Sequence, residues 1–468
     1  MSTAPSTSKP SQQFWILALF LLILFATGGA SRPDVQSLTV LHPVSVMMCA
    51  LACMNLRREH FAGRAWLLGC TGVIIALVVL HLIPLPPSLW HSLSGRQDLA
   101  NVEHLAGLSD IWRPLTLTPQ RGWHALTSLA TPLAVILLGI QLSRHELFRL
   151  LPLVIALASF SGLIGLLQVI GAAQGPLYFY EVTNNGWAVG LFANRNHAAT
   201  LLACLFPMLA VYASLANGKL KSVHISQMIA AAVAILLVPL ILVAGSRSGL
   251  VSAVIGLGAA ALLYRQRSNV RMVTLSKLER LKGLPTIGGS VVVVSLAILT
   301  YFLSRAQAIE RLLNLEAAED ERGDFWVISV DMFWKYFPWS SGSGSFVEAY
   351  QNAEPTSLLD ATYLNRAHND WAETAVTFGL HGIIILLAVG IAFGIRSYRL
   401  WRSRDDSKPA IIYGQLASVL IAIIAIASAS DYPLRTPTMM GLLAIFAVWF
   451  TEAEIDQSSQ SFVSRESS

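Results

Sequence analysis

The sequence predicts an all-α fold, that of a polytopic integral membrane protein with about 12 transmembrane helices. Hydrophobic residues make up 54% of the 468 residues and charged residues only 13%, whereas soluble globular domains carry about 25% charged residues. The mean hydropathy is +0.58. Apolar runs of roughly 20 residues, long enough to cross a bilayer as a helix, recur along almost the whole chain. No basic cluster with interleaved aromatic residues occurs, so the sequence does not indicate nucleic-acid binding.

The expected helices follow from these apolar runs, taken in order. Residues 1–13 are rich in Ser, Thr and Pro, and we expect a disordered N-terminus. Residues 14–30 lack the basic flank of a signal peptide beyond Lys9, so we interpret them as a retained first helix. The twelve predicted spans are 14–30, 40–56, 65–84, 122–142, 148–171, 191–215, 226–245, 248–264, 286–304, 372–396, 411–429 and 436–451.

The distribution of positive charge predicts the orientation of these spans. The segments 56–64, 143–149, 217–224, 265–284 and 396–408, together with both termini, hold 20 of the 32 Lys and Arg residues and 9 of the 27 Asp and Glu residues. Six of the seven lysines lie in these segments, and Lys335 is the exception. By the positive-inside rule, both termini are cytoplasmic.

This orientation places a long polar segment at the outer face of the membrane. The expected organisation is spans one to nine in 14–304, an outer loop in 305–371 that carries site residues, spans ten to twelve in 372–451, and a cytoplasmic tail in 452–468. Aromatic and apolar residues at helical spacing in 325–337 predict a helix that lies against the bundle or in the membrane interface and ends at Pro338. We expect a turn around Gly342 and Gly344, and a loop over 349–363.

Four polar clusters fall on the predicted outer side, each beside an apolar span or in the long loop. Polar groups at the mouth of a membrane helix are costly to build, so these clusters are candidate sites. They contain Asn194, Arg195 and His197; Arg247; Arg322 and Trp326; and His368, Asn369 and Asp370.

Arg247 lies in a short turn between two apolar spans. It either snorkels to the lipid head groups or caps the hairpin, or it is a fixed cation for an anionic ligand. Arg195 and Arg322 carry the same alternatives, and acidic neighbours of Arg322 offer it an ion pair. Three arginines at one end of a bundle would suit a phosphate or pyrophosphate, because guanidinium binds phosphate bidentately and stays charged.

His368 is the candidate general base, since a histidine titrates near neutral pH. Asp370 would hold the imidazole or cap a helix, and Asn369 has the same capping alternative. His197 is either a second polar contact or a residue of the membrane interface.

No metal or other cofactor is expected. The acidic run 316–324 contains no His, no DxD motif lies on the outer side, and consecutive acidic residues on a helix are usually solvated. The chain has no Walker motif, Rossmann fingerprint or serine nucleophile elbow. Its four cysteines lie in apolar runs and are interpreted as free thiols.

Together, these motifs resemble the O-antigen ligase and O-antigen polymerase superfamily of bacterial membrane glycosyltransferases, over about residues 185–450. The resemblance implies a GT-C-like enzyme that takes a glycan from undecaprenyl pyrophosphate at the outer face of the inner membrane, without a metal. The acceptor would be another glycan or lipid A-core, membrane lipid would surround the enzyme, and a chain-length regulator is a further partner. The motifs do not separate a ligase from a polymerase. The residues that carry the resemblance are 190–197 before one span, 246–249 between two spans, Arg322 and Trp326 before 342–344, and 367–369 before another span.

The resemblance also implies roles for individual residues. Arg247, Arg195 and Arg322 would hold the pyrophosphate, and His368 would activate the acceptor hydroxyl. The alternative class is a transporter of polysaccharide or lipid-linked glycan that makes no bond. It predicts ionisable residues deep in the spans, which are nearly free of them. A membrane sensor is a third hypothesis, but no cytoplasmic output domain is recognisable.

Overall fold

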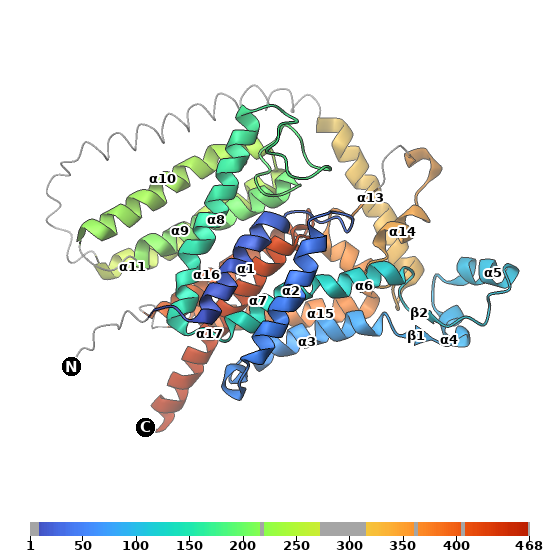
Figure 1. The fold of residues 1–468 in the computed structure, drawn as a ribbon, viewed down its shortest axis with the longest axis horizontal. Coiled ribbons are helices and arrows are strands. Elements are labelled where there is room, and N and C mark those ends of the chain that lie inside the picture. Colours follow the sequence, from blue (N-terminus) through green and yellow to red (C-terminus); the bar gives the residue numbers. More distant parts are fainter. Residues whose placement is uncertain (1–8, 216–219, 272–314, 360–363, 404–407, 467–468) are drawn as a thin grey trace.

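The computed structural model describes residues 9–215, 220–271, 315–359, 364–403 and 408–466, and Figure 1 shows an assembly of helices. The two short strands, β1 (Pro84–Leu85) and β2 (Arg113–Pro114), form one antiparallel pair that joins Pro84 to Pro114. The helices of the first half are α1 (Gln12–Thr27), α2 (Leu38–Met54), η1 (Arg58–Phe61), α3 (Ala65–Leu80), α4 (Pro87–Ser92), α5 (Gln97–Leu105), α6 (Pro119–Ser128), α7 (Ala130–Gly139) and α8 (Arg144–Ile170). Those of the second half are α9 (Arg195–Leu215), α10 (Leu220–Ala244), α11 (Arg247–Arg271), α13 (Leu315–Tyr336), α14 (Phe346–Gln351), η3 (Thr356–Leu358), α15 (Asp370–Trp401), α16 (Pro409–Ala427), η4 (Pro433–Arg435) and α17 (Pro437–Glu466).

The helices confirm the all-α class, and within the described residues eleven of the twelve predicted spans coincide with apolar helices. Seven of these helical stretches are long and apolar enough to cross a membrane, and four further apolar helices are shorter. The predicted span 286–304 lies outside the described residues. Figure 1 shows the start of α1 and the end of α17 on the same side of the bundle, and Ser11 N donates to Glu146 Oε1 there at 2.6 Å.

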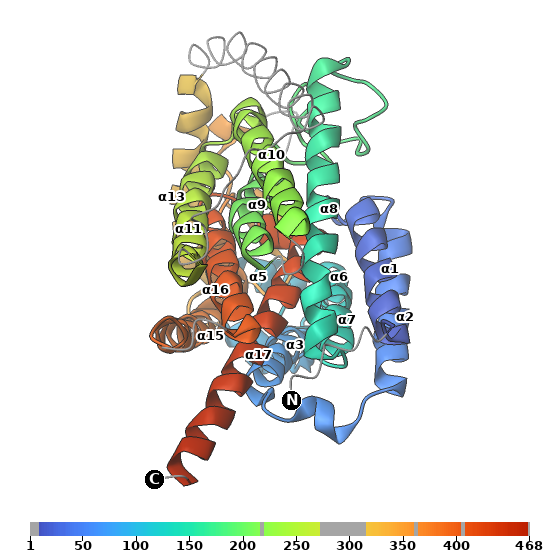
Figure 2. The same cartoon turned by 90° about the vertical axis from the view of Figure 1, so that its left-hand side faces the viewer.

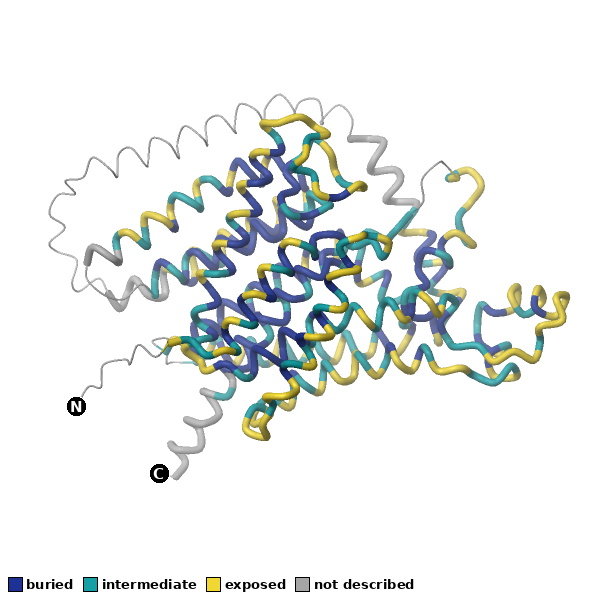
Figure 3. Tube along the Cα trace, viewed as in Figure 1, coloured by how far each residue is buried: buried dark blue, intermediate teal, exposed yellow. Residues whose placement is uncertain are grey.

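Helix α9 lies at the centre of the bundle and α15 at its edge. In the most apolar 18-residue window of each helix, 78% of the residues are buried in α9 but only 11% in α15. Neighbours of α9 are α8, α10, α11 and α16, and Figure 2 shows α9 enclosed by helices while α15 is seen end-on at the periphery. Figure 3 shows the same contrast as a dark buried centre and an exposed outer face. An apolar helix that is largely exposed needs lipid around it, so α15 is a lipid-facing helix.

Small residues let α11 pack closely on α9. A Cβ added to Gly249 would lie 2.3 Å from Cβ of Ala199, and one added to Gly256 would lie 2.5 Å from the carbonyl oxygen of Ala203. Close backbone approach through small residues is a common way for helices to associate in lipid, where burial of apolar surface supplies little driving force. This contact sets the first turn of α11, which begins with Arg247, beside the first turns of α9.

Gln168 secures the segment that leads into α9. Its side chain is 2% exposed. Its Oε1 accepts from Val189 N (3.0 Å) and Gly190 N (2.8 Å), and its Nε2 donates to the carbonyl oxygens of Leu177 (2.8 Å) and Gly190 (2.9 Å). A buried amide with this many partners orders the backbone that it contacts. The chain therefore reaches Asn194 from a fixed direction.

Helix α15 bends where it meets the loop 338–345. Gly379 has φ +58° inside the helix, and a Cβ there would lie 2.5 Å from the carbonyl oxygen of Pro338. The freed backbone groups pair with the loop, because Leu380 N donates to Pro338 O (3.0 Å) and Ser341 N donates to Val376 O (3.1 Å). The predicted helix before Pro338 is confirmed as α13, whereas the predicted loop 349–363 is wrong at its start. Phe346, Val347 and Tyr350 are buried, and this apolar face extends a helix to Gln351.

Candidate functional site

Three connections distant in sequence meet at one end of the bundle. They are the start of α9, the segment before α15, and the turn 428–436 between α16 and α17. Asp370 N donates to the carbonyl oxygens of Ser428 (2.9 Å) and Asp431 (3.2 Å), so the start of α15 is tied to that turn. The meeting point holds the predicted residues Asn194, His197, His368, Asn369 and Asp370.

Asp431 is the centre of this site. It is 1% exposed, and its carboxylate faces two histidines. Oδ1 lies 3.6 Å from Nε2 of His197 and 3.9 Å from Nδ1 of His368. Asn196 donates a short hydrogen bond to Oδ2, and Tyr432 N donates to Oδ1 at 2.8 Å.

These partners keep Asp431 ionised. Burial alone would raise the pKa of its carboxyl group, but the contact with His197, the charges of His197 and His368, and the bond from Asn196 outweigh burial and hold the pKa below its ordinary value. A buried carboxylate that stays charged can stabilise a positive charge that forms beside it. The arrangement can therefore stabilise a histidine that takes up a proton.

Tyr432 lies between the same two histidines. Its ring makes edge contacts with the rings of His197 and His368, with centroid separations of 5.0 Å in both cases. Burial raises the pKa of Tyr432, and the charge of Asp431 adds to the effect, so the phenol remains protonated at neutral pH. Asn194 Nδ2 donates to its hydroxyl oxygen at 3.5 Å.

His368 occupies an unusual backbone conformation at the rim of this cluster. Its φ is +51°, in the left-handed region that residues other than glycine seldom adopt. Its side chain is 30% exposed, and its ring stacks on Phe325 of α13 with centroids 6.4 Å apart. Such conformations persist where surrounding contacts enforce them, often at functional sites. His368 is thus both held by buried groups and open to a ligand.

The two residues after His368 have structural partners. Asn369 caps α15, because its Oδ1 accepts from Trp371 N and Ala372 N, each at 3.0 Å. The carboxylate of Asp370 accepts from Arg435 Nε (3.0 Å) and from the Ser428 hydroxyl (3.0 Å). The predicted role of Asp370, to hold the imidazole or to cap the helix, stays a prediction. The structure shows that Asp370 pairs with Arg435 and Ser428, that Asn369 caps α15, and that Asp431 is the carboxylate beside His368.

A network of buried charged side chains fixes the segment before α15. Glu373 is 1% exposed. Its Oε1 accepts from Arg366 NH1 at 2.9 Å and lies 3.4 Å from Arg435 NH2, while Oε2 accepts from Ala367 N at 3.3 Å. Carboxylates buried to this degree require such pairing. The pairs join the segment before α15 to the turn after α16 and hold His368 in place.

The three predicted cations lie in helices α9, α11 and α13. Arg195 begins α9, and its guanidinium stacks on the ring of Trp187 at 3.5 Å. Arg247 begins α11 and is exposed. Trp326 is 53% exposed, and its neighbour Phe325 is the α13 residue that contacts His368. Arg322 belongs to α13, but its side chain lies outside the described residues.

Sequence reasoning identified the turn that holds Asp431 and Tyr432 but no functional residue in it. The available signal was an acidic residue between two apolar spans on the predicted outer side, the same signal that marks Arg247. Asn196 lies in the motif 190–197, but its hydrogen bond is to Asp431, 235 positions away in the chain.

Comparison with known proteins agrees with the motifs. No curated protein matches the chain. Residues 231–387 match the family model described as O-antigen ligase, and this range contains Arg247, Arg322, Trp326 and the residues 368–370. Asn194, Arg195, His197 and Asp431 lie outside the matched range. This part of the chain is therefore similar to the O-antigen ligase family, which confirms the resemblance to the O-antigen ligase and polymerase superfamily.

Proposed function

We propose that this protein is a glycosyltransferase that moves a glycan from undecaprenyl pyrophosphate to an acceptor hydroxyl. The observation that carries the proposal is the pairing of His368 with the buried carboxylate of Asp431, 3.9 Å away, beside the first turns of α9 and α11. A partly exposed imidazole with a buried carboxylate is suited to take a proton from a hydroxyl group. The family match supplies the class of reaction.

In the proposed reaction, the acceptor oxygen attacks the anomeric carbon of the donor sugar. The bond from that carbon to the pyrophosphate oxygen breaks, and its electron pair leaves with the pyrophosphate. The hydroxyl proton passes to His368, and Asp431 stabilises the imidazolium that forms. Attack from the face opposite the leaving group inverts the configuration of the anomeric carbon. Because Nδ1 faces Asp431, Nε2 is the atom that receives the proton.

The leaving pyrophosphate gains negative charge as the bond breaks. Arg195 and Arg247 begin neighbouring helices, and Arg322 lies one turn before Phe325 in α13. Guanidinium groups that stay charged would stabilise the leaving group without any proton transfer. Apolar helices beside them would hold the polyprenyl chain. The proposed mechanism requires no metal.

The proposed setting is the inner membrane, with both termini in the cytoplasm and the site in the periplasm. The distribution of lysine and arginine supports this orientation. Sugar nucleotides of the cytosol do not reach a periplasmic site, which favours a lipid-linked donor. The acceptor is lipid A-core for a ligase and a second repeat unit for a polymerase. A polymerase would also work with a chain-length regulator.

A transfer assay with purified protein tests the proposal against a transporter. Vesicles containing the full-length protein, undecaprenyl-pyrophosphate-linked glycan and acceptor should yield a product with a new glycosidic bond, detected by mass spectrometry. A transporter would instead move glycan across the vesicle membrane and leave donor and acceptor unchanged. That result would overturn the proposal.

The Asp431→Asn variant should lower the rate of transfer by about 10- to 100-fold, because contacts to a charged group contribute about 1.5–3 kcal/mol and each ~1.4 kcal/mol is a factor of ten in rate. The asparagine preserves the shape of the side chain but cannot compensate an imidazolium. We expect kcat to fall while KM for the donor changes little. The matched control is Asp110→Asn, at an exposed position outside the cluster.

The pH dependence of stability checks the same residue independently. The folded-state pKa of Asp431 is below the value of about 3.9 for an unfolded aspartate. The ionised carboxylate therefore stabilises the fold above that value, and the contribution is lost as pH falls through the folded-state pKa. The difference in Tm between the wild-type protein and Asp431→Asn should be present at about pH 5 and shrink below about pH 4. A difference that instead grows as the pH falls below about 4 would contradict this assignment.

A further inference from the structure

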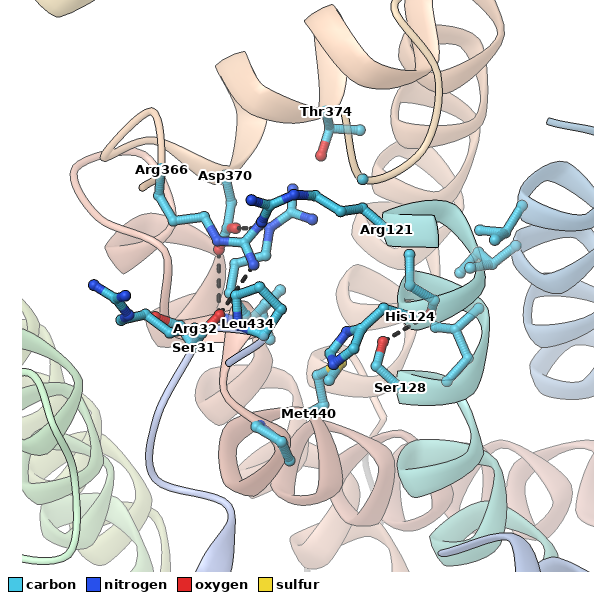
Figure 4. Close-up of a pocket in the computed structure, with 18 of the residues that line it drawn as sticks. Ser31, Arg32, Arg121, His124, Ser128, Arg366, Asp370, Thr374, Leu434 and Met440 are labelled. Atoms are coloured by element: carbon cyan, nitrogen blue, oxygen red, sulfur yellow. Dashed lines mark hydrogen bonds and ion pairs between the residues drawn. The ribbon is translucent and has the colours of Figure 1, made fainter. Parts of the chain in front are cut away.

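A cavity of about 310 Å³ lies on the opposite face of the segment that carries His368. Figure 4 shows it between α6, the start of α15, the segment 31–33 and the turn after α16. Arg366 and Asp370 line the cavity, whereas His368 does not. The segment before α15 therefore separates two polar sites, and it contributes to both.

Four arginines from separate parts of the chain line the cavity: Arg32, Arg121, Arg366 and Arg435. Asp370 is the only carboxylate among the lining residues within the described part of the chain. Figure 4 shows the side chains of Arg121 and Arg366 extending toward one another across the cavity. Like charges repel, so guanidiniums that converge on one space favour an anion between them.

Each arginine also has a carboxylate partner, and the positions of these partners explain why the cavity wall is cationic. Asp34, which accepts from Arg32 Nε at 2.9 Å, has a 58% exposed side chain. Glu348 pairs with Arg121, and Glu373 pairs with Arg366. None of these three carboxylates lines the cavity. These three pairs fix the guanidiniums of Arg32, Arg121 and Arg366, whereas Arg435 pairs with Asp370, which itself lines the cavity.

The backbone around Arg121 is fixed by the loop 338–345. Leu117 N donates to Ser341 O at 3.0 Å, and the Thr116 hydroxyl donates to Ser343 O at 2.9 Å. Gly344, with φ +81°, approaches so closely that a Cβ there would lie 2.6 Å from the carbonyl oxygen of Arg121. The charge of Arg121, after that of Arg32, also lowers the pKa of Asp34. Arg121 is thus a preorganised cation and not a freely moving surface side chain.

Much of the remaining lining is apolar, although His42, His124 and several serine and threonine side chains also contribute to it. Its walls include Leu38 of α2, Ile74 and Val78 of α3, Phe378 and Leu386 of α15, and Met440 of α17. A site with cations at one part and aliphatic or aromatic walls at another suits an amphiphile with an anionic head. The volume is at the lower end of the roughly 300–1,000 Å³ that small-molecule sites occupy. It accommodates a head group and the first part of a chain.

We propose that this cavity binds a phosphate-bearing amphiphile, separate from the donor pyrophosphate, through Arg32, Arg121, Arg366 and Arg435. Two sources share this chemistry, an anionic phospholipid of the bilayer and a phosphorylated glycolipid that serves as acceptor. A phosphorylated glycolipid acceptor rests on the proposed transferase function, whereas binding of a phosphate-bearing amphiphile to the cavity does not depend on that function. Guanidinium forks would hold the phosphate oxygens, and the apolar walls would cover the adjoining chain.

Native mass spectrometry of the delipidated full-length protein tests this site with three probes. Phosphatidylglycerol and monophosphoryl lipid A carry a phosphate with net negative charge, and phosphatidylcholine with the same acyl chains as the phosphatidylglycerol is the zwitterionic control. We expect at least one anionic probe to bind more tightly than phosphatidylcholine. Arg121→Gln should raise its Kd by about tenfold, the effect of losing one charge-assisted hydrogen bond. Arg32→Gln, whose partner Asp34 is exposed, should act in the same direction, and the Tm of both variants is measured in parallel.

The matched control is Arg113→Gln, at an arginine of similar exposure that pairs with Glu103 and does not line the cavity. Its Kd values should equal those of the wild-type protein. Equal binding of all three probes, or equal losses in Arg121→Gln and Arg113→Gln, would overturn the proposal. Tighter binding of phosphatidylglycerol identifies a bilayer phospholipid, and tighter binding of monophosphoryl lipid A identifies an acceptor. His368→Ala should bind the anionic probes as tightly as the wild-type protein does. Lipid binding and transfer activity are therefore separate measurements, and one proposal can fail without the other.

Discussion

Replacing His368 with alanine is expected to abolish detectable surface polysaccharide that depends on this protein. A positioned general base contributes about 10²–10⁴-fold to rate, and the methyl group of alanine has no atom to accept the hydroxyl proton. The loss should appear in kcat, since the base acts as the bond forms. Immunoblots of whole-cell polysaccharide and the vesicle transfer assay measure it in the cell and in vitro.

The control for this variant is His104→Ala, at an exposed histidine of α5 outside both polar sites. Both variants should reach the membrane in wild-type amounts. His368 has φ +51°, so alanine is no better suited to this backbone than histidine, and Tm should be measured in parallel. Unchanged polysaccharide in His368→Ala, at wild-type protein levels, would exclude His368 as the base.

The Arg247→Ala variant should reduce transfer by about 10²–10³-fold, the range observed when one group that stabilises developing negative charge is removed. Arg247 begins α11 beside the first turns of α9, where close packing of Gly249 on Ala199 sets its backbone. The side chain is exposed, so alanine removes the cation with little effect on packing. Transfer from undecaprenyl-pyrophosphate-linked glycan in vesicles measures the loss.

Arg113→Ala is the matched arginine control, and Arg247→Lys refines the interpretation. Lysine keeps the charge but loses the bidentate geometry, so its activity should fall between those of alanine and arginine. If Arg247 only snorkels to lipid head groups, Arg247→Lys should have full activity. Arg247→Ala should then lower the amount of protein in the membrane but leave the activity of each protein molecule unchanged. That pattern would contradict a role in holding pyrophosphate.

Most of the fold could be predicted because the determinants of a membrane helix are local. A bilayer imposes an apolar run of nearly constant length, and the eleven predicted spans within the described residues each meet an apolar helix. The helix before Pro338 was predictable for a related reason, since proline lacks a backbone donor and often ends or kinks a helix. The signal is incomplete, because Pro152 and Pro207 lie inside the continuous helices α8 and α9. The helix over 346–351 was missed because it is only six residues long and depends on burial of Phe346 and Tyr350.

The bend of α15 is a property that the apolar pattern conceals. Residues 372–396 read as one continuous span, yet Gly379 leaves the helical conformation to meet the carbonyl oxygens of Pro338 and Trp339. Glycine in a helix has several packing roles, and sequence alone does not reveal which one applies. The partner loop begins 41 positions earlier and is brought there by tertiary packing.

For the site, the local sequence specifies which residue types stand at the ends of the apolar helices. His197, Arg247 and His368 are visible because a polar group at such a position is costly and therefore conspicuous. Which of these groups meet depends on the packing of distant segments. This packing places Asp431, from a turn after α16, between His197 of α9 and His368, and it turns Asp370 toward Arg435. Pairing of buried charges depends on distances of a few ångströms between segments far apart in the chain, and no local pattern encodes those distances.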